Sequence, residues 1–181
     1  MAISQTIVEG DRIYLRYIEL SDVNDNYLSW LNDDEVMKGI VTSGYNLQNL
    51  QSYVRGKINS KHTHFFAIVL KSNNLHIGNI KLDFHDSKSN LSEMGILIGD
   101  KNYWSKGIAK EACDLILNYG FKKLKLRKIF LAVFENNISA LNLYKSLGFK
   151  IEGKLIKHVE VKGTLYDKYL MGIFSKDFFK K

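Results

Sequence analysis

The chain has 181 residues, 45% of them hydrophobic, which is enough for one folded domain, residues 1–181, with a packed core. Its single cysteine, Cys113, excludes an internal disulfide and a cysteine-rich zinc cluster, so we expect no metal and a reducing, cytoplasmic setting. The formal charge is +7, but the lysines are spread along the chain, which argues against a nucleic-acid partner. Residues 1–6 do not resemble a secretion signal, and no stretch approaches the ~18 to 20 apolar residues of a membrane span, so no membrane partner is expected.

Hydrophobic periodicity predicts the elements of the first half of the chain. Residues 12–18 alternate apolar and polar side chains and predict a half-buried strand. Ser21 or Asp22 can cap the helix that follows, in which apolar residues recur every three or four positions as far as Asp33. Further along, we expect a helix over 47–58, strands over 65–70 and 77–84 joined by the polar turn 71–74, and a strand over 93–98.

The second half begins with the most strongly periodic helix, residues 107–124, whose apolar stripe also makes Cys113 a core residue rather than a nucleophile. A strand over 128–134 follows directly. Strand 93–98, the helix and this strand therefore form a βαβ unit with a right-handed crossover and parallel strands. A helix over 139–147 and strands over 152–162 and 164–173, joined at Gly163, complete one mixed α/β domain. The stripe of the long helix consists of Ala109, Ala112, Cys113, Ile116, Leu117, Gly120, Phe121 and Leu124.

The turn before the long helix carries the clearest chemical signal. Gly107 opens the helix, so several unpaired backbone N–H groups point out of its N-terminus. These amides and the positive end of the helix dipole attract phosphate, and the small residues Gly107 and Ala109 let phosphate oxygens approach the backbone. The turn lacks the Gly-Lys-Ser/Thr end of a P-loop and the glycine pattern of a dinucleotide fold. A different phosphorylated ligand is therefore indicated.

Two segments carry a family resemblance. Trp104-Ser105-Lys106-Gly107-Ile108-Ala109 resembles the Arg/Gln-x-x-Gly-x-Gly/Ala signature of the GNAT superfamily of N-acetyltransferases. Trp104 replaces the usual Arg or Gln, as in the branch with ribosomal-protein N-terminal and nucleotide-aminosugar acetyltransferases, where Tyr-Trp-x-x-Gly recurs. Residues 133–140 and 143–153 resemble the second cofactor segment of the family. The resemblance implies acetyl-CoA as cofactor and a mixed, mostly antiparallel sheet of about seven strands, splayed between strands four and five, with about four helices.

The resemblance also implies the residues that hold acetyl-CoA. The backbone of the turn would bind the pyrophosphate, Asn136 would bond the pantetheine arm, and Ser139 would cap the next helix. At the splay, the fourth strand would leave free backbone groups that pair with the pantetheine and polarise the thioester carbonyl. The implied cofactor residues are Ile96, Leu97, Ile98, Trp104, Ser105, Lys106, Gly107, Ile108, Ala109, Asn136 and Ser139.

Amide formation needs a neutral amine, donors for the oxyanion and a proton for the departing thiolate. Tyr144 is the candidate acid, since a phenol with a pKa of about 10 is protonated at neutral pH; packing at a helix–sheet seam is the alternative. Glu93 is the first candidate base, directly or through a water, with pairing to a cation as its alternative. His85 and Asp83 are further candidates, and a histidine titrates in the more suitable range.

The acceptor side is less defined by the sequence. Trp30, Tyr45, Phe84 and His85 are candidates to line its pocket, although core packing also explains the aromatic residues. Residues 27–36 resemble a Trp-Leu-Asn-Asp-x-Glu-Val pattern of sugar-modifying members, and the run from Asp33 through Asp34 to Glu35 borders the acceptor site in relatives or forms a solvated face. We therefore expect direct attack by the primary amine of a nucleotide-linked aminosugar. A protein N-terminus, a polyamine or aminoglycoside, and a CoA-binding module without turnover are the alternatives, and a homodimer is one possible assembly.

Overall fold

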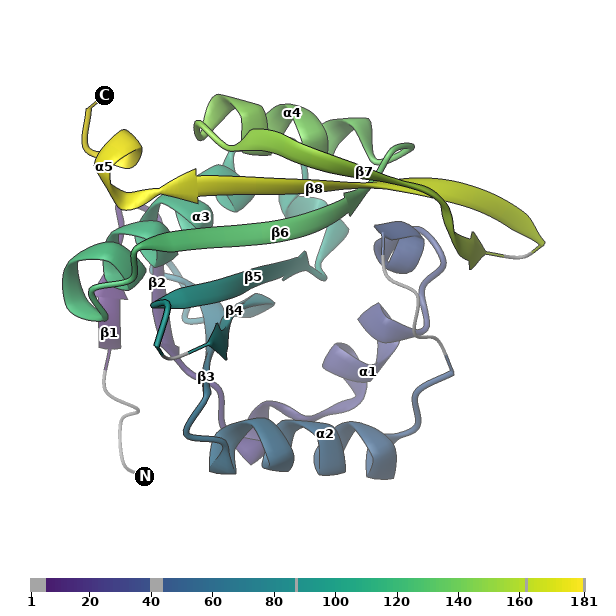
Figure 1. Cartoon of the computed structure of the whole chain (residues 1–181). Helices are drawn as coiled ribbons and strands as arrows, with labels where there is room; N and C mark the ends of the chain where they lie inside the picture. Colours follow the sequence, from purple (N-terminus) through teal and green to yellow (C-terminus); the bar gives the residue numbers. More distant parts are fainter. Residues whose placement is uncertain (1–5, 40–43, 87, 162, 181) are drawn as a thin grey trace.

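A computed structural model describes residues 6–39, 44–86, 88–161 and 163–180 (Figure 1). One eight-stranded sheet runs through these residues in the order β1-β2-β3-β4-β5-β6-β8-β7. Its strands are β1 (Thr6–Glu9), β2 (Ile13–Tyr17), β3 (Thr63–Leu70), β4 (His76–Asp86), β5 (Leu91–Ile98), β6 (Lys128–Phe134), β7 (Lys150–Val161) and β8 (Thr164–Phe174). The α-helices are α1 (Asp25–Leu31), α2 (Leu47–Asn59), α3 (Ile108–Asn118), α4 (Ile138–Ser146) and the short α5 (Ser175–Phe178).

The mixed, mostly antiparallel sheet predicted from the sequence is confirmed, and β5 and β6 form its one parallel pair in the described chain. The sheet has eight strands rather than about seven, because the four-residue β1 adds an edge strand beside β2. A strand of this length is too short for an alternating pattern to reveal it. In the same way, the four-residue α5 makes five α-helices rather than about four.

Two helix boundaries differ from the prediction. Residues Leu20–Asp22 form the 3-10 turn η1, and Asn24, not Ser21 or Asp22, caps α1 by accepting a hydrogen bond from the amide of Tyr27. The carboxylate of Asp22 is instead buried against Arg16, at 2.6 and 2.7 Å. The long helix is α-helical only to Asn118 and continues as a π-helical turn, η4 (Tyr119–Lys123).

The parallel strands β5 and β6 separate after a short stretch of pairing. They are in register only from Leu91–Lys128 to Glu93–Phe130. Beyond Glu93, β5 stays paired with β4 and β6 stays paired with β8, so a wedge opens inside the sheet. The predicted splay between the fourth and fifth long strands is thus confirmed, and the two strands diverge visibly in Figure 1.

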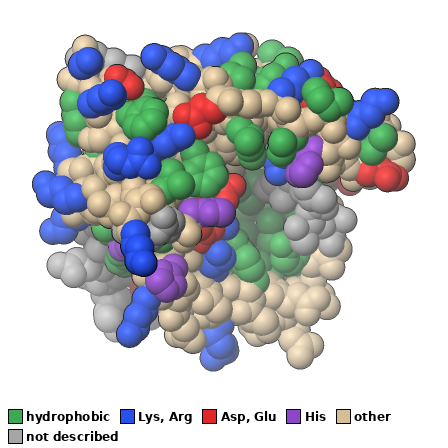
Figure 2. All heavy atoms as spheres, viewed as in Figure 1, with side chains coloured by type: hydrophobic (Ala, Val, Ile, Leu, Met, Phe, Trp, Pro, Cys, Tyr) green, Lys and Arg blue, Asp and Glu red, His purple; other side chains and the backbone are tan. Residues whose placement is uncertain are grey.

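Two hydrophobic cores lie on opposite faces of the sheet. The first joins the sheet to α3 and α4 and contains Cys113, which is fully buried as expected. The second joins it to α1, α2 and the 3-10 turn η2 (Val36–Gly39). Among the described residues, no helix combines the length and apolar character needed to span a membrane. On the face in Figure 2, lysine and arginine side chains are dispersed rather than gathered into one patch.

Candidate functional site

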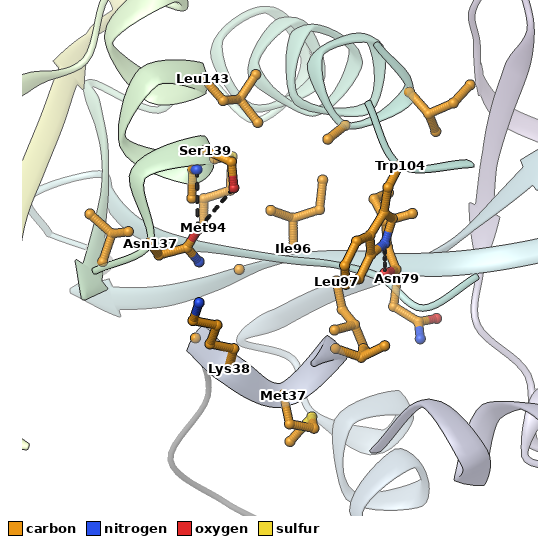
Figure 3. A pocket seen from close by; sticks show the side chains of 18 of the residues that line it. Met37, Lys38, Asn79, Met94, Ile96, Leu97, Trp104, Asn137, Ser139 and Leu143 are labelled. Atoms are coloured by element: carbon orange, nitrogen blue, oxygen red, sulfur yellow. Dashed lines mark hydrogen bonds between the residues drawn. The ribbon is translucent and has the colours of Figure 1, made fainter. Parts of the chain in front are cut away.

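The wedge between β5 and β6 continues into a cleft of about 1040 Å³ that reaches both cores. The space-filling view shows a hollow with hydrophobic side chains at its floor (Figure 2). In the close-up, Met37 and Lys38 lie on one side of the cleft, Ser139 and Leu143 on the other, with Ile96 between them (Figure 3). The cleft brings together most of the predicted site residues: Tyr45, Glu93, Ile96, Leu97, Ile98, Trp104, Ser105, Gly107, Ile108, Ala109, Asn136, Ser139 and Tyr144.

The turn before α3 presents uncapped backbone amides to this cleft. Gly107 has φ = 77° and Ser105 has φ = 57°, both in the left-handed region. The first bond of α3 runs from the amide of Glu111 to the carbonyl of Gly107, so the amides of the preceding three residues have no partner within the helix. Within the described chain no side chain caps this end, whereas asparagines cap α1, α2 and α4. The N-terminus of α3 is therefore free to bind an anion.

Arg12, at the start of β2, fixes the shape of this turn. Its guanidinium donates to the carbonyl of Lys106 at 2.7 Å and to the carboxylate of Glu111 at 2.8 Å. Burial would raise the pKa of Glu111, but the hydrogen bonds from Arg12 and Ile13 outweigh it and lower that pKa. Sequence reasoning missed Arg12 because its partner stands 99 positions away and no local pattern connects them.

Of two further residues of the predicted turn, one lies outside the lining of the cleft and the other lines it. Lys106 does not line it: its carbonyl is held by Arg12, and its ammonium lies over the ring of Tyr103, 5.7 Å from the centroid. Trp104 does line the cleft, and its indole nitrogen donates to the carbonyl of Ile98 at 2.8 Å. Trp104 therefore ties the turn to the end of β5.

The bond from Trp104 to the carbonyl of Ile98 shows which backbone groups of β5 face the wedge. Backbone groups alternate in direction along an antiparallel pair. The amide of Gly99 bonds the carbonyl of Ile77 on β4, whereas the carbonyl of Ile98 points to Trp104. By alternation, Ile96 directs its backbone groups into the wedge and Leu97 directs them at its partner Asn79 on β4. The expectation of free backbone groups at Leu97 is thus wrong, and only its side chain faces the cleft.

On the opposite wall, the start of α4 presents three polar residues. Asn137 caps α4 by accepting from the amide of Ala140, so the prediction that Ser139 is the cap is wrong. The Ser139 hydroxyl donates to the same Asn137 oxygen at 3.1 Å, as Figure 3 shows. Asn136 also lines the cleft, and its side-chain oxygen is buried with no hydrogen-bond partner in the described chain. A buried acceptor of this kind is costly unless a ligand satisfies it.

Tyr144 lies on α4 at the boundary between the first core and the cleft. The residue is 9% exposed, and its ring packs against Phe149 with centroids 5.8 Å apart. Burial, reinforced by the neighbouring Cys113, raises the pKa of the Tyr144 hydroxyl above its ordinary value. The group is therefore a proton donor rather than a phenolate at neutral pH. Tyr144 therefore both packs at a helix–sheet seam and lines the cleft.

Glu93 stands where β5 leaves β6 and lines the cleft, with 43% of its side chain exposed. Nε2 of His85 lies 3.7 Å from its carboxylate, outside the lining of the cleft. Asp83 is engaged by Lys57 at 2.8 Å and by Lys81 at 2.6 Å. Burial would raise the pKa of Asp83, but these contacts and a hydrogen bond from Thr63 lower it to about 2. Asp83 is thus a poor base at neutral pH.

The predicted acceptor-side residues divide into two groups. Tyr45 lines the cleft, but Trp30 is 4% exposed in the second core, packed against Tyr27 and His76. Phe84 packs on the first core, and His85 lies beside Phe130, so neither lines the cleft. The prediction that Trp30 and Phe84 line the acceptor pocket is therefore wrong, since their rings are used in packing. His85, whose side chain is 60% exposed beside Glu93, stays a prediction.

The acidic run after α1 has a mixed role. Asp33 accepts from the amides of Glu35 and Val36 and from Lys101, which ties η2 to the 3-10 turn η3 (Lys101–Tyr103) after β5. Asp33 is thus structural, while Glu35 lines the cleft.

A family model for the acetyltransferase (GNAT) domain matches residues 12–150. The chain belongs to the GNAT acetyltransferase family. An uncharacterized N-acetyltransferase, p20, of Bacillus licheniformis is 28% identical over 172 residues, which cover 93% of this chain and 96% of that protein. The spermidine N(1)-acetyltransferase of Escherichia coli K12 is 34% identical over 87 residues, covering 48% of this chain and 46% of that protein.

Solved structures show the same fold for this GNAT acetyltransferase. A GNAT-family acetyltransferase from Bacillus anthracis superposes with a TM-score of 0.82 at 24% identity, covering 93% of this chain and 98% of that one. The spermidine N-acetyltransferase from Vibrio cholerae, solved in complex with CoA and spermine, gives 0.86 at 24% identity, covering 94% and 99%. These structures show the fold, and membership of the GNAT acetyltransferase family makes the chain an N-acetyltransferase that uses acetyl-CoA. The uncapped end of α3 and the unpaired Asn136 oxygen fit such a ligand.

Proposed function

We propose that the cleft transfers the acetyl group of acetyl-CoA to the primary amine of a small molecule by direct attack. The observation that carries this proposal is the wedge itself, because it places an anion-binding helix end, unpaired backbone of β5 and a buried phenol along one channel. We assign the pyrophosphate to the amides of Ile108 and Ala109 at the start of α3 and the pantetheine arm to Asn136. Bound acetyl-CoA supplies the thioester.

Three groups of the chain would act on the reacting atoms. The backbone N–H of Ile96 faces the wedge and can donate to the oxygen of the thioester carbonyl as negative charge develops on it. Tyr144 keeps its proton at neutral pH because burial raises its pKa, so it can donate that proton to the sulfur as the C–S bond breaks. Glu93 can remove a proton from the acceptor's ammonium, directly or through a water, so that the neutral amine attacks the thioester carbon, because its exposed carboxylate lines the same cleft.

The acceptor lies, in this proposal, on the side of the second core. There the cleft is lined by aromatic and apolar side chains from α1, α2, η2 and the segment just before α2: Tyr27, Leu31, Val36, Met37, Tyr45 and Tyr53. These surfaces suit a compact molecule that inserts its amine toward Glu93. A nucleotide-linked aminosugar is one such molecule, and a polyamine is the alternative suggested by the names of the spermidine acetyltransferase relatives.

The test is an acetyl-transfer screen that detects free CoA thiol, with aminosugars, aminosugar nucleotides, polyamines and short peptides as acceptors. We expect thiol release above the rate without amine for at least one small primary amine. Mass spectrometry of the product should show one added acetyl group. Tight binding of acetyl-CoA without thiol release for any acceptor would contradict turnover and favour a CoA-binding module.

A further inference from the structure

One polar side chain in the cleft has its donor unused. Asn79, on β4, is 4% exposed and lines the cleft beside Leu97 (Figure 3). Its side-chain oxygen lies 3.0 Å from Nε2 of His76, whereas its side-chain nitrogen is buried with no partner in the described chain. A buried NH₂ group without an acceptor is unfavourable, because it has lost its hydrogen bonds to water. A ligand that supplies an acceptor atom would remove this cost.

The orientation of the Asn79 amide follows from its neighbours. Nε2 of His76 is within 2.9 Å of the Gly78 carbonyl and 3.0 Å of the Asn79 oxygen. Two acceptors around one ring nitrogen require that nitrogen to carry the proton. Burial lowers the pKa of His76, which keeps the ring neutral with its proton at this position. The Asn79 oxygen is therefore held by His76, and the NH₂ group is the part left for a ligand.

Lys81 lies two residues along β4 and projects from the same face of the sheet as Asn79, about 7 Å away. Its side chain lines the cleft and crosses Gly95 of β5, where a Cβ would stand 3.2 Å from Cε of Lys81. Its ammonium donates to Asp83 and lies 3.4 Å from the hydroxyl of Tyr53. The missing side chain at Gly95 thus leaves room for Lys81 to extend across the acceptor side.

Two ammonium groups contact one carboxylate beside Lys81. Asp83 is shared by Lys57 and Lys81, so it balances only one of them, and the next carboxylate on this face is Glu93, the register partner of Asp83. Interaction with Tyr53 and Asp83 outweighs burial and raises the pKa of Lys81, so this lysine remains charged. Glu93 also lines the cleft, at the position proposed for the base. Lys81 and the Asn79 amide together form a cation and a hydrogen-bond donor on one wall.

Resting on the proposed function, we infer that the acceptor is a primary amine that also carries an oxyanion, phosphate or carboxylate, bound by the Asn79 amide and the Lys81 ammonium. An oxyanion accepts both contacts, and charge-assisted hydrogen bonds of this kind are the stronger ones. A polyamine would bring its positive charge next to the Lys81 ammonium, which repels it. It would also offer no acceptor atom to the Asn79 amide. The acceptor class is therefore an anionic amine rather than a polyamine.

The experiment compares kcat/KM for matched acceptors that differ by one anionic group: glucosamine against glucosamine 6-phosphate, and 1-aminobutane against 4-aminobutanoate, with spermidine as the polycation. We expect the wild type to prefer the anionic member of at least one pair by ~10-fold or more, as one charge-assisted contact allows. The pair that shows the preference distinguishes phosphate from carboxylate. Equal or lower kcat/KM for both anionic members, or a preference for spermidine, would overturn the inference.

Variants locate the preference. Lys81→Met should bring the ratio of the two kcat/KM values to within ~2-fold of one and Asn79→Leu should lower it by ~3- to 10-fold, while Lys81→Arg should retain it. Lys122→Met, which removes an exposed lysine at η4, is the control for net charge and should leave the ratio unchanged. An unchanged ratio in a folded Lys81→Met, with its Tm near that of the wild type, would overturn the assignment. Failure of the proposed function differs, because no amine would then release CoA thiol.

Discussion

The backbone at Gly107 allows a direct test of the phosphate-binding turn. Its φ of 77° lies in the left-handed region, where a side chain costs about 1–2 kcal/mol. The Cβ of Gly107→Ala would also stand 3.3 Å from Nη2 of Arg12. Without CoA, the turn of the variant can relax and relieve this strain. Binding of CoA then requires the strained conformation again. The affinity for CoA should therefore fall by up to ~5- to 30-fold, the equivalent of 1–2 kcal/mol.

The chain contains a matched control for this substitution. Gly163, in the turn between β7 and β8, has φ = 79°, and no described atom lies within 4 Å of a Cβ there. Gly163→Ala thus carries the same backbone cost away from the cleft. That cost lowers Tm by ~2–8 °C in a protein of this size. Calorimetric titration with CoA should show weakened binding for Gly107→Ala alone. Equal dissociation constants for the two variants would refute the assignment of the pyrophosphate to this turn.

Four further predictions concern single side chains. Tyr144→Phe should lower kcat by ~10²- to 10⁴-fold and leave the acetyl-CoA dissociation constant unchanged; an unaltered kcat removes the hydroxyl from the mechanism. Glu93→Gln should lower kcat/KM by ~10²- to 10⁴-fold with the acetyl-CoA dissociation constant unchanged, and an unaltered kcat/KM would place the base elsewhere. Arg12→Met should weaken CoA binding several-fold in titrations without loss of the folded circular-dichroism spectrum, because the carbonyl of Lys106 loses its anchor; unaltered affinity would show that the turn holds its shape unaided. Asp83 has a pKa of about 2 in the folded protein, below its unfolded value, so its stabilising contribution is present above pH ~4 and is lost as the pH falls toward 2. The wild type should therefore exceed Asp83→Asn in unfolding free energy by about 2 kcal/mol at pH 7, and denaturant titrations should show this excess shrinking between pH 4 and 2; a constant difference would contradict the ion-pair account.

The sequence predicted the parts of the site that depend on local pattern. The turn to which we assign the pyrophosphate stood out because a strand, a glycine and a periodic helix follow one another within residues 93–124. The splay and the position of Tyr144 followed from a family resemblance rather than from periodicity. Contacts between distant segments gave no local signal, so the bond of Arg12 to Glu111 was found only in the structure. The contact between Asn79 and His76 joins near neighbours on β4, but no motif singled it out.

The errors on the acceptor side share one physical cause. An aromatic residue serves equally well in a core or in a pocket, and its sequence context does not distinguish the two. Trp30 went to the second core because Gly99, whose Cβ would stand 2.0 Å from the indole, leaves space for the ring. Asp33 accepts from a turn amide and pairs with Lys101, because a short polar side chain readily bonds backbone groups close to it in the sequence. It is then not available to a ligand. In our proposal the polar contacts to the acceptor come instead from Asn79 and Lys81 on β4, which no motif singled out.

The two proposed proton-transfer groups stand on opposite faces of the sheet. Tyr144 belongs to the first core with α3, whereas Glu93 shares its side-chain direction with Gly95 and Leu97, toward the second core. Because β5 and β6 separate just after Glu93, a ligand threaded through the wedge has its thioester between these faces. The amine would then lose its proton on one side of the sheet and the sulfur gain one on the other. The splay thus separates the carboxylate of Glu93 from the hydroxyl of Tyr144. No proton then passes directly from the acid to the base before both act on the substrates.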